Sequence, residues 1–246
     1  MNPELPGQDF YDQGEVFERY TQKRKRANSP NELIEKPIIR RLVQGIKGDV
    51  LDLGCGYGDL SEELLALGAS SYLGVDASAK MIEMGQQVVC DQRIRLEQAE
   101  LTQFEYGLSN YDWAIARLVL HYIEDLAGFF RDLYQGLRPN AQFLFSVEHP
   151  LLTSSMHLPR PAGKKQDWTV DQYFAEGARS QNWLGGSVVK YHRSLETYWQ
   201  LLKDAGFRVV EIKEGRPDIS LFQDQSEYER RSRIPIFLII KAERID

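Results

Sequence analysis

The chain of 246 residues has few of the features that mark secreted or membrane proteins. It holds two cysteines, Cys55 and Cys90, too few for a disulfide framework and without the spacing of a zinc site, so we expect no structural disulfide or metal. No window approaches 18 consecutive apolar residues, and the polar, acidic start MNPELPGQDFYDQ does not resemble a signal peptide. These absences predict an unprocessed cytoplasmic protein that does not enter a membrane.

An excess of basic charge is also missing. The 30 lysines and arginines are outnumbered by 36 aspartates and glutamates, and the formal net charge of −6 opposes binding to a phosphate backbone. The basic run KRKR at 23–26 is more typical of a solvated face than of a nucleic-acid site. We therefore expect a small-molecule partner and no nucleic acid, and the composition leaves the oligomeric state open.

What the sequence does contain is a series of short apolar runs, and between the first five of them lie segments with helical periodicity. Gly68 marks the end of one helix, and Arg138-Pro139-Asn140 separates a second helix from the fifth run. Strands that alternate with helices predict a parallel sheet covered on both faces, which is a doubly wound α/β fold. The predicted strands are 49–53, 71–75, 93–98, 111–116, 142–147, 207–212 and 234–240.

We expect residues 1–246 to form one domain with four parts. Residues 1–45 are predicted to be a helical cap, 46–147 the ligand-binding core, 148–190 a lid, and 191–246 a C-terminal helix and strands. The lid shows neither strand nor long helix periodicity, and an insertion at the carboxyl edge of a central strand is where a substrate pocket is built. Its aromatic residues either line a site for a flat or aromatic small molecule or anchor the loop; they are Trp168, Tyr173, Phe174, Trp183 and Tyr191.

The stretch GDVLDLGCGYGD at 48–59 places glycines 54, 56 and 58 in the turn after the first predicted strand. In a doubly wound sheet this turn faces the ligand, and glycines let the main chain approach it. The spacing GxGxG differs from the GxGxxG of a dinucleotide site, and Asp59 at the helix start would repel a pyrophosphate. Asp76 ends the second strand, where a carboxylate can accept hydrogen bonds from ribose hydroxyls. A ribose with a cationic centre fits S-adenosylmethionine, whereas the spacing opposes a nicotinamide-dependent oxidoreductase.

The segment VLDLGCGYGDLSEELLALGASSYLGVDASAKMIEMGQ, followed by YDWAIARLVLHYIEDL and LRPNAQFLFSVEHP, resembles the class I S-adenosylmethionine-dependent methyltransferases. The resemblance implies a Rossmann-like seven-stranded sheet, mostly parallel, with an antiparallel last strand. It implies S-adenosyl-L-methionine as cofactor, S-adenosyl-L-homocysteine as product and a small molecule as methyl acceptor. The cofactor-binding residues that it implies are Tyr20, Arg24, Gly54, Cys55, Gly56, Asp76, Ala77, Met81, Glu100, Leu101, Ala116 and Arg117.

Methyl transfer from a sulfonium is an in-line displacement, which needs a general base only when the accepting atom must lose a proton. Candidates for that base follow the fourth and fifth strands or lie where the lid rejoins the core: His121, Glu148, His149 and His192. Each histidine has a structural alternative, since a histidine at a strand end often serves only as a hydrogen-bonding group. A further alternative is a cofactor-binding partner protein without turnover, whose lid would dock another chain.

Overall fold

The computed structural model describes residues 4–5, 16, 19, 28–158, 167–183 and 186–245. Tyr20 and Arg24, which the resemblance implies as cofactor-binding residues, lie outside the described residues.

The centre of the molecule is a seven-stranded sheet in the order β4-β3-β2-β5-β6-β10-β9. The strands are β2 (Gly48–Leu53), β3 (Ala69–Asp76), β4 (Ile94–Gln98), β5 (Tyr111–Arg117), β6 (Leu137–Glu148), β9 (Phe207–Lys213) and β10 (Phe237–Arg244). The pairs from β4 to β6 are parallel, whereas β10 runs antiparallel to both β6 and β9. This topology confirms the predicted doubly wound sheet, including its antiparallel last strand.

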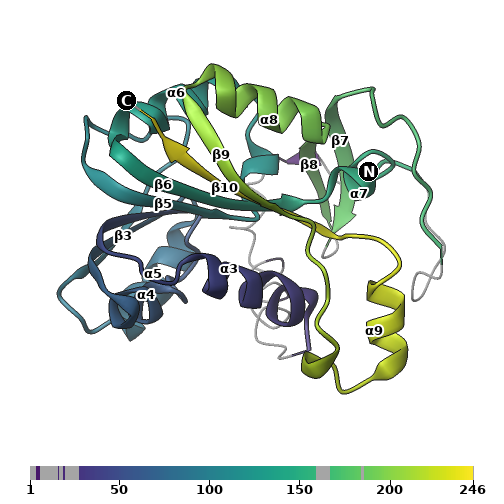
Figure 1. The fold of residues 1–246 in the computed structure, drawn as a ribbon, viewed down its shortest axis with the longest axis horizontal. Helices are drawn as coiled ribbons and strands as arrows, with labels where there is room; N and C mark the ends of the chain where they lie inside the picture. The colour runs from purple at the N-terminus through teal and green to yellow at the C-terminus, as the bar shows by residue number, and fades with distance from the viewer. Residues whose placement is uncertain are drawn as a thin grey trace.

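Helices cover both faces of this sheet (Figure 1). On one face lie α6 (Leu126–Gly136) and α8 (Leu195–Asp204), and on the other lie α3 (Lys36–Leu42), α4 (Ser61–Leu67) and α5 (Ala79–Val88). The first face buries a cluster rich in aromatic rings, in which Phe130 of α6 lies 5.8 Å from Phe143 of β6 between ring centroids. The second face buries aliphatic side chains, among them Ile39 and Leu64. Two separate cores therefore hold the sheet from its two sides.

Of the two helix ends predicted from glycine and proline, the one at Gly68 is observed and the one near Pro139 lies a few residues earlier. Gly68 follows α4 with a φ of 123°, and a Cβ there would lie 2.8 Å from the Ile46 carbonyl oxygen. The second boundary was predicted at residues 138–140. In the structure β6 begins before it, at Leu137, directly after α6. Asn140 has a φ of 64°, and the pairing with β5 changes register beside it. The turn is therefore an irregularity inside a longer strand.

The N-terminal cap is helical over Asn31–Leu42, where a π-helical turn, η1 (Asn31–Glu35), continues into α3. Ile34, Ile38 and Ile39 are buried in the cluster on the second face of the sheet. The chain also forms a short strand, β1 (Glu4–Leu5), that pairs in parallel with a strand of the lid. Sequence analysis did not predict this strand, because two residues are too few to show a period.

The prediction that the lid lacks strands was wrong. After a short helix, α7 (Pro150–Thr153), it forms an antiparallel hairpin of β7 (Gly177–Trp183) and β8 (Gly186–His192), and β1 completes a separate three-stranded sheet. Lys190 and His192 occupy buried positions of β8 where an apolar side chain would be expected. Because strand prediction relies on alternating apolar residues, these buried polar residues concealed the hairpin.

The connection between β9 and β10 contributes two further helical segments, η3 (Ile219–Leu221) and α9 (Gln225–Arg231). Asp224 begins α9 by accepting hydrogen bonds from the backbone N–H groups of Ser226 and Glu227. Figure 1 shows α9 away from the helical layers, below the lid hairpin. Within the described part of the chain, no helix combines the length and the apolar composition needed to span a membrane.

Candidate active site

A cavity of about 520 Å³ lies at the carboxyl ends of the central strands. It sits where the strand order reverses between β2 and β5, which is where doubly wound sheets bind ligands. One end is formed by the glycine turn and the N-terminus of α5, and the other by the lid hairpin and α9. The predicted site residues that line it are Gly54, Gly56, Asp76, Ala77, Met81, Glu100, Leu101, Arg117, His121 and Glu148.

The glycine turn needs glycine for two different reasons. Gly54 has a φ of 71°, and a Cβ on it would lie 2.7 Å from Cγ2 of Val119, so the turn packs directly against the chain after β5. Gly56 has a φ of 60°, but a Cβ there would meet nothing within 4 Å. Gly54 therefore serves packing, whereas the missing side chain of Gly56 keeps space open in the cavity for a ligand.

Asp76 is held at the edge of the cavity by backbone N–H groups. The amide of Gly56 donates to Oδ2 at 2.7 Å, and the amide of Ser78 donates to Oδ1 at 2.9 Å. Ser78 in turn caps α5 by accepting from the Met81 amide at 3.3 Å. The carboxylate is thus oriented by the glycine turn and by the start of α5. Such a fixed carboxylate beside a bare glycine fits a ligand with paired hydroxyl groups.

Cys55 and Ala116 are absent from the described residues that line the cavity, although both were predicted to contact the cofactor. Both are buried. The Cys55 sulfur lies only 2.8 Å from the position that a Cβ on Gly74 would take, so the thiol fills space between strands. Burial raises the pKa of this thiol well above its usual value. The Cys55 side chain therefore serves packing, and only the backbone of this residue could contact a ligand.

Arg117 lines the cavity from the end of β5, and a carboxylate of the N-terminal cap holds it in place. Its Nε donates to Oε1 of Glu35 at 3.0 Å and its Nη2 donates to Oε2 at 2.6 Å. The hydroxyl of Ser146 on β6 also donates to Glu35 Oε1, at 2.8 Å. All three side chains are buried, so this network joins the cap to two central strands. Sequence analysis missed Glu35, whose signal was a glutamate within the apolar run LIEKPII.

Asp59 lies just before α4, as the sequence predicts, but two cations flank its carboxylate. Its carboxylate oxygens lie 3.7 Å from Lys36 Nζ and 3.8 Å from Arg117 Nη1, and it is absent from the described lining residues. Its negative charge is therefore offset by two cations beside the cavity. The GxGxG spacing still opposes a pyrophosphate ligand, whereas the charge of Asp59 does not.

The chain after β5 has a strained conformation at the cavity wall. Leu118 has a φ of 55°, which is unfavourable for a side chain of this size. Its amide is held by the Ser146 carbonyl at 2.9 Å and lies 3.1 Å from the Ser146 hydroxyl. Leu118 and Val119 both line the cavity. Such strain persists only where the surroundings enforce it, and it is typical of functional sites.

Two histidines predicted as candidate bases lie outside the cavity, among the described residues. His149 caps α7, with Nδ1 accepting from the Leu151 amide at 3.2 Å and Nε2 facing Glu214 at 3.3 Å. His192 is fully buried, with Nε2 bonded to the Tyr173 carbonyl at 2.9 Å and Nδ1 bonded to Thr153 Oγ1 at 2.7 Å. Burial lowers the pKa of both imidazoles. Each of the four ring nitrogens has a partner within the protein, which is what the structural alternative expects.

The other two candidates, His121 and Glu148, do line the cavity. His121 is 2% exposed, and burial together with the charge of Lys190 lowers its pKa to about 3, so the ring is neutral at neutral pH. Glu148 Oε1 lies 2.9 Å from Nζ of Lys190, which is also 2% exposed and lies 5.5 Å from the ring centroid of Tyr122. A base acts best when its pKa is near the working pH, so His121 is better suited to hydrogen bonding than to proton transfer.

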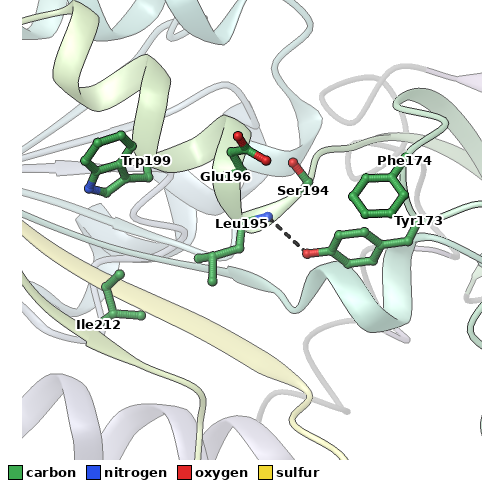
Figure 2. A pocket seen from close by; sticks show the side chains of 7 residues that line it. All are labelled: Tyr173, Phe174, Ser194, Leu195, Glu196, Trp199 and Ile212. Atoms are coloured by element: carbon green, nitrogen blue, oxygen red, sulfur yellow. Dashed lines mark hydrogen bonds between the residues drawn. The ribbon is translucent and has the colours of Figure 1, made fainter.

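The lid aromatics do not form a common wall of the cavity. Trp168 lines it, whereas Tyr191 donates to Glu124 Oε2 at 3.1 Å. Tyr173 and Phe174 lie instead in a second pocket of about 440 Å³ between the lid and α8, opposite Trp199 and Ile212 (Figure 2). The side chain of Trp183 lies outside the described part of the structure. The alternative that these rings anchor the lid therefore holds for Tyr173, whose hydroxyl accepts from the Leu195 amide at 3.2 Å.

Several cavity residues were not predicted from the sequence. Gln181 and Lys190 come from the lid hairpin, and Arg230 and Arg231 come from α9. Both arginines pair with Glu227, and Arg230 lowers the pKa of that carboxyl to about 2. The lysine within 186–192 interrupts the apolar alternation that would have predicted the hairpin, and α9 carried no signal either. The described residues contain no group of three His, Cys, Asp or Glu that could hold a metal ion.

The sheet topology, the glycine turn and the oriented carboxylate at the carboxyl edge define the class of S-adenosylmethionine-dependent methyltransferases. A family model described as a methyltransferase domain matches residues 15–212, and the chain belongs to this family. Its cofactor is S-adenosylmethionine, and the open cradle at Gly56 beside the Asp76 carboxylate fits that group.

Known proteins are similar to this chain over most of its length. The structure of an S-adenosylmethionine-dependent methyltransferase from Mesorhizobium loti superposes with a TM-score of 0.78 at 33% identity, covering 88% of this chain and 99% of that one. A protein of uncharacterised function from Haemophilus influenzae is 31% identical over 96% of this chain and 97% of its own. A phosphoethanolamine N-methyltransferase from Haemonchus contortus, in complex with S-adenosyl-L-methionine, shares the fold at 14% identity with a TM-score of 0.66, over 97% of this chain and 60% of that one.

Proposed function

We propose that this enzyme methylates a small, flat molecule held between the glycine turn and the lid. The observation that carries the proposal is a continuous cavity that joins Gly56 and Asp76 at one end to Glu148 and Trp168 at the other. Its volume of about 520 Å³ is in the range of small-molecule sites. The rings of Tyr122, Trp168 and Phe237 line it and support a flat or aromatic acceptor.

At the cofactor end, each residue has a proposed task. Asp76, oriented by two amides, accepts hydrogen bonds from the ribose hydroxyls, and Glu100 accepts from the adenine amino group. Met81 and Leu101 are buried side chains that line the cavity and can pack against the adenine ring. Ala77 lies beside them, and Gly54, Gly56 and Arg117 adjoin the methionine part. Bound S-adenosylmethionine supplies a methyl group on a positively charged sulfur.

At the acceptor end, the protein has to hold the nucleophile in line with the methyl group and exclude water. Residues of the lid hairpin and α9 line this end of the cavity and can shield it from water. Glu148 is the side chain we assign as proton acceptor for an acceptor group that must lose a proton. Its Oε1 lies 2.9 Å from Nζ of Lys190, which holds the carboxylate in place at the cavity wall. His149 and His192 are given no part, because their ring nitrogens have other partners.

Calorimetric titration of the purified protein with S-adenosylmethionine, S-adenosylhomocysteine and NAD in parallel tests the cofactor end. We expect binding of the first two at micromolar concentration and none of NAD. Formation of S-adenosylhomocysteine with a panel of small phenols and amines then tests the acceptor. Cofactor binding without product from any member of the panel would favour the alternative of a partner protein without turnover. Binding of NAD alone would overturn the proposal.

A further inference from the structure

Helix α9 presents one face of charged side chains to the cavity. Glu227, Arg230 and Arg231 lie three and four residues apart, so they share a side of the helix. Their side chains are 20%, 14% and 20% exposed, and both arginines line the cavity. Glu229, on the opposite side of the helix, is exposed. The two arginines therefore belong to the site and not to the outer surface.

Contacts with the sheet and the lid hold this part of the chain at the acceptor end of the cavity. Phe237, which begins β10 after α9, lies opposite Glu148 in the register of β6. The guanidinium of Arg233 lies 5.2 Å from the ring centroid of Trp168 in the lid. Phe237, Glu148 and Trp168 all line the cavity. The arginines of α9 thus lie at the end that we assign to the methyl acceptor.

Two guanidinium groups on this face share one carboxylate. Arg230 donates to Glu227 from Nε at 3.1 Å and from Nη2 at 2.5 Å, and Arg231 donates from Nε at 2.8 Å. Within the described chain, Glu227 is the one carboxylate within 4.0 Å of either guanidinium, so the three side chains carry a surplus of one positive charge. Burial and the charge of Arg230 lower the pKa of Arg231, as expected for a cation that is not fully compensated.

The carboxylates beside the lid hairpin are engaged elsewhere. Glu148 Oε1 lies 2.9 Å from Lys190 Nζ, and Glu124 Oε2 accepts from the Tyr191 hydroxyl at 3.1 Å. Arg193 lies next to Glu124 and donates to its carbonyl oxygen at 2.6 Å. Both carboxylates therefore contact the strand β8, and the surplus charge on α9 remains for a ligand.

Three nitrogen atoms of the arginine pair can reach such a ligand. Nη1 of Arg230 and both Nη atoms of Arg231 have no hydrogen-bond partner among the described residues, and none of the three is sealed from solvent. A guanidinium binds a carboxylate through parallel N–H groups. One surplus positive charge matches a singly charged carboxylate better than a doubly charged phosphate group.

We infer that Arg230 and Arg231 bind a carboxylate on the methyl acceptor, an assignment that rests on the proposed function and specifies the class of its substrate. The carboxylate neutralises a cation that is mostly withdrawn from water, which favours an acid over an uncharged molecule of the same shape. It also fixes one end of a flat acceptor at α9, so that the rest of the molecule extends into the cavity toward the cofactor.

Matched acids and amides test this site by ligand-observed NMR titration, at pH 7.5, of the protein saturated with S-adenosylhomocysteine. The pairs are benzoate with benzamide, para-hydroxybenzoate with para-hydroxybenzamide, and phenylacetate with phenylacetamide. Each amide keeps the shape of its acid but carries no charge. We expect at least one acid to bind about tenfold more tightly than its amide, as for a hydrogen bond to a charged group. Phenyl phosphate should bind no more tightly than benzoate.

Four variants test the charge count on α9. Arg230→Met and Arg231→Met each leave one guanidinium with Glu227, so the surplus disappears and each acid should bind about as weakly as its amide. Glu227→Gln leaves two uncompensated guanidinium groups and should increase the preference for the acid. Arg216→Met is the matched control, because it removes the same charge from an exposed residue of the same connection, and it should preserve the preference.

The outcomes separate the carboxylate site from the proposed function. If no acid binds more tightly than its amide, or if the preference survives both Arg230→Met and Arg231→Met, the inference is wrong while cofactor binding still supports the methyltransferase. Weaker binding of S-adenosylhomocysteine by these two variants would assign the arginines to the cofactor, and tighter binding of phenyl phosphate would assign them to a phosphate; either result overturns the inference. Failure of the wild type to bind S-adenosylhomocysteine would overturn both. Thermal denaturation of each variant distinguishes a lost site from a lost fold.

Discussion

Removing the carboxylate of Glu35 should destabilise the protein far more than removing a surface carboxylate. Glu35 is fully buried and accepts two hydrogen bonds from Arg117, at 3.0 and 2.6 Å, and one from Ser146 at 2.8 Å. Removing one partner of a buried ion pair costs about 3–5 kcal/mol, because the other charge stays in a low dielectric. Asp59 lies 3.8 Å from Arg117 Nη1 and offsets part of that charge. We therefore expect Glu35→Ala to lower the free energy of unfolding by about 3 kcal/mol, the lower end of that range.

Urea denaturation at pH 7.5 measures this change, and the chain offers a matched control. Arg40 and Glu63 form a pair of the same bidentate geometry, at 2.7 and 2.8 Å, but their side chains are 50% and 29% exposed. Glu63→Ala should therefore cost less than about 1 kcal/mol. The double variant Glu35→Met with Arg117→Met removes both buried charges, so it should be more stable than Glu35→Ala alone.

Two results would refute this reasoning. If Glu35→Ala lowered the free energy of unfolding no more than Glu63→Ala, burial would not make the Glu35–Arg117 pair more important for stability than an exposed pair. If the effects of Glu35→Met and Arg117→Met were simply additive, the two side chains would act independently, and the cap would not be joined to the sheet through this pair.

Three further changes test the site. Asp76→Ala should weaken S-adenosylmethionine binding by about 1–3 kcal/mol, through lost hydrogen bonds to a charged group; unchanged affinity in calorimetry would contradict the ribose assignment. His121 has a pKa of about 3 when folded and an ordinary value of 6.5, so the unfolded chain binds the extra proton and stability falls as the pH drops from 6.5 toward 3. Between pH 7.5 and 5, the free energy of unfolding measured with urea should fall by about 2 kcal/mol more in the wild type than in His121→Phe. The same pH dependence in both proteins would show that the imidazole is not buried as a neutral group. Gly54→Ala should cost about 1–3 kcal/mol more stability than Gly45→Ala, because both have positive φ but only the first would meet Val119; equal costs would exclude that contact.

Much of the fold could be predicted because its signals are local. The seven strands of the main sheet, the end of α4 at Gly68 and the helical cap over 31–42 each follow from periodicity or from a residue with special backbone freedom. The hairpin of the lid could not be predicted in this way, since Gln181, Lys190 and His192 interrupt the alternation that identifies a strand. The burial of Lys190 and His192 is compatible with the fold because Glu148, Thr153 and Tyr173 meet these two side chains in space.

The candidate site, too, could be predicted only where its signals are local. The cofactor end was predictable because the glycine turn and Asp76 follow consecutive parallel strands, which bring their carboxyl ends to one edge of the sheet. The acceptor end was not, because its walls come from segments far apart in the chain. His149 was one of the candidate bases, yet in the structure its nitrogens contact the Leu151 amide and Glu214.

The sequence by itself determined the fold class and the identity of the cofactor, since both depend on residue types at fixed local spacing. Only the tertiary structure decided which polar side chains share the cavity. It paired Arg117 with Glu35 across 82 positions of the chain and Lys190 with Glu148, and it turned His121 and Gln181 toward the same space. Long-range pairing of this kind depends on the desolvation of charges and polar atoms in three dimensions, for which a linear pattern of residues carries no signal.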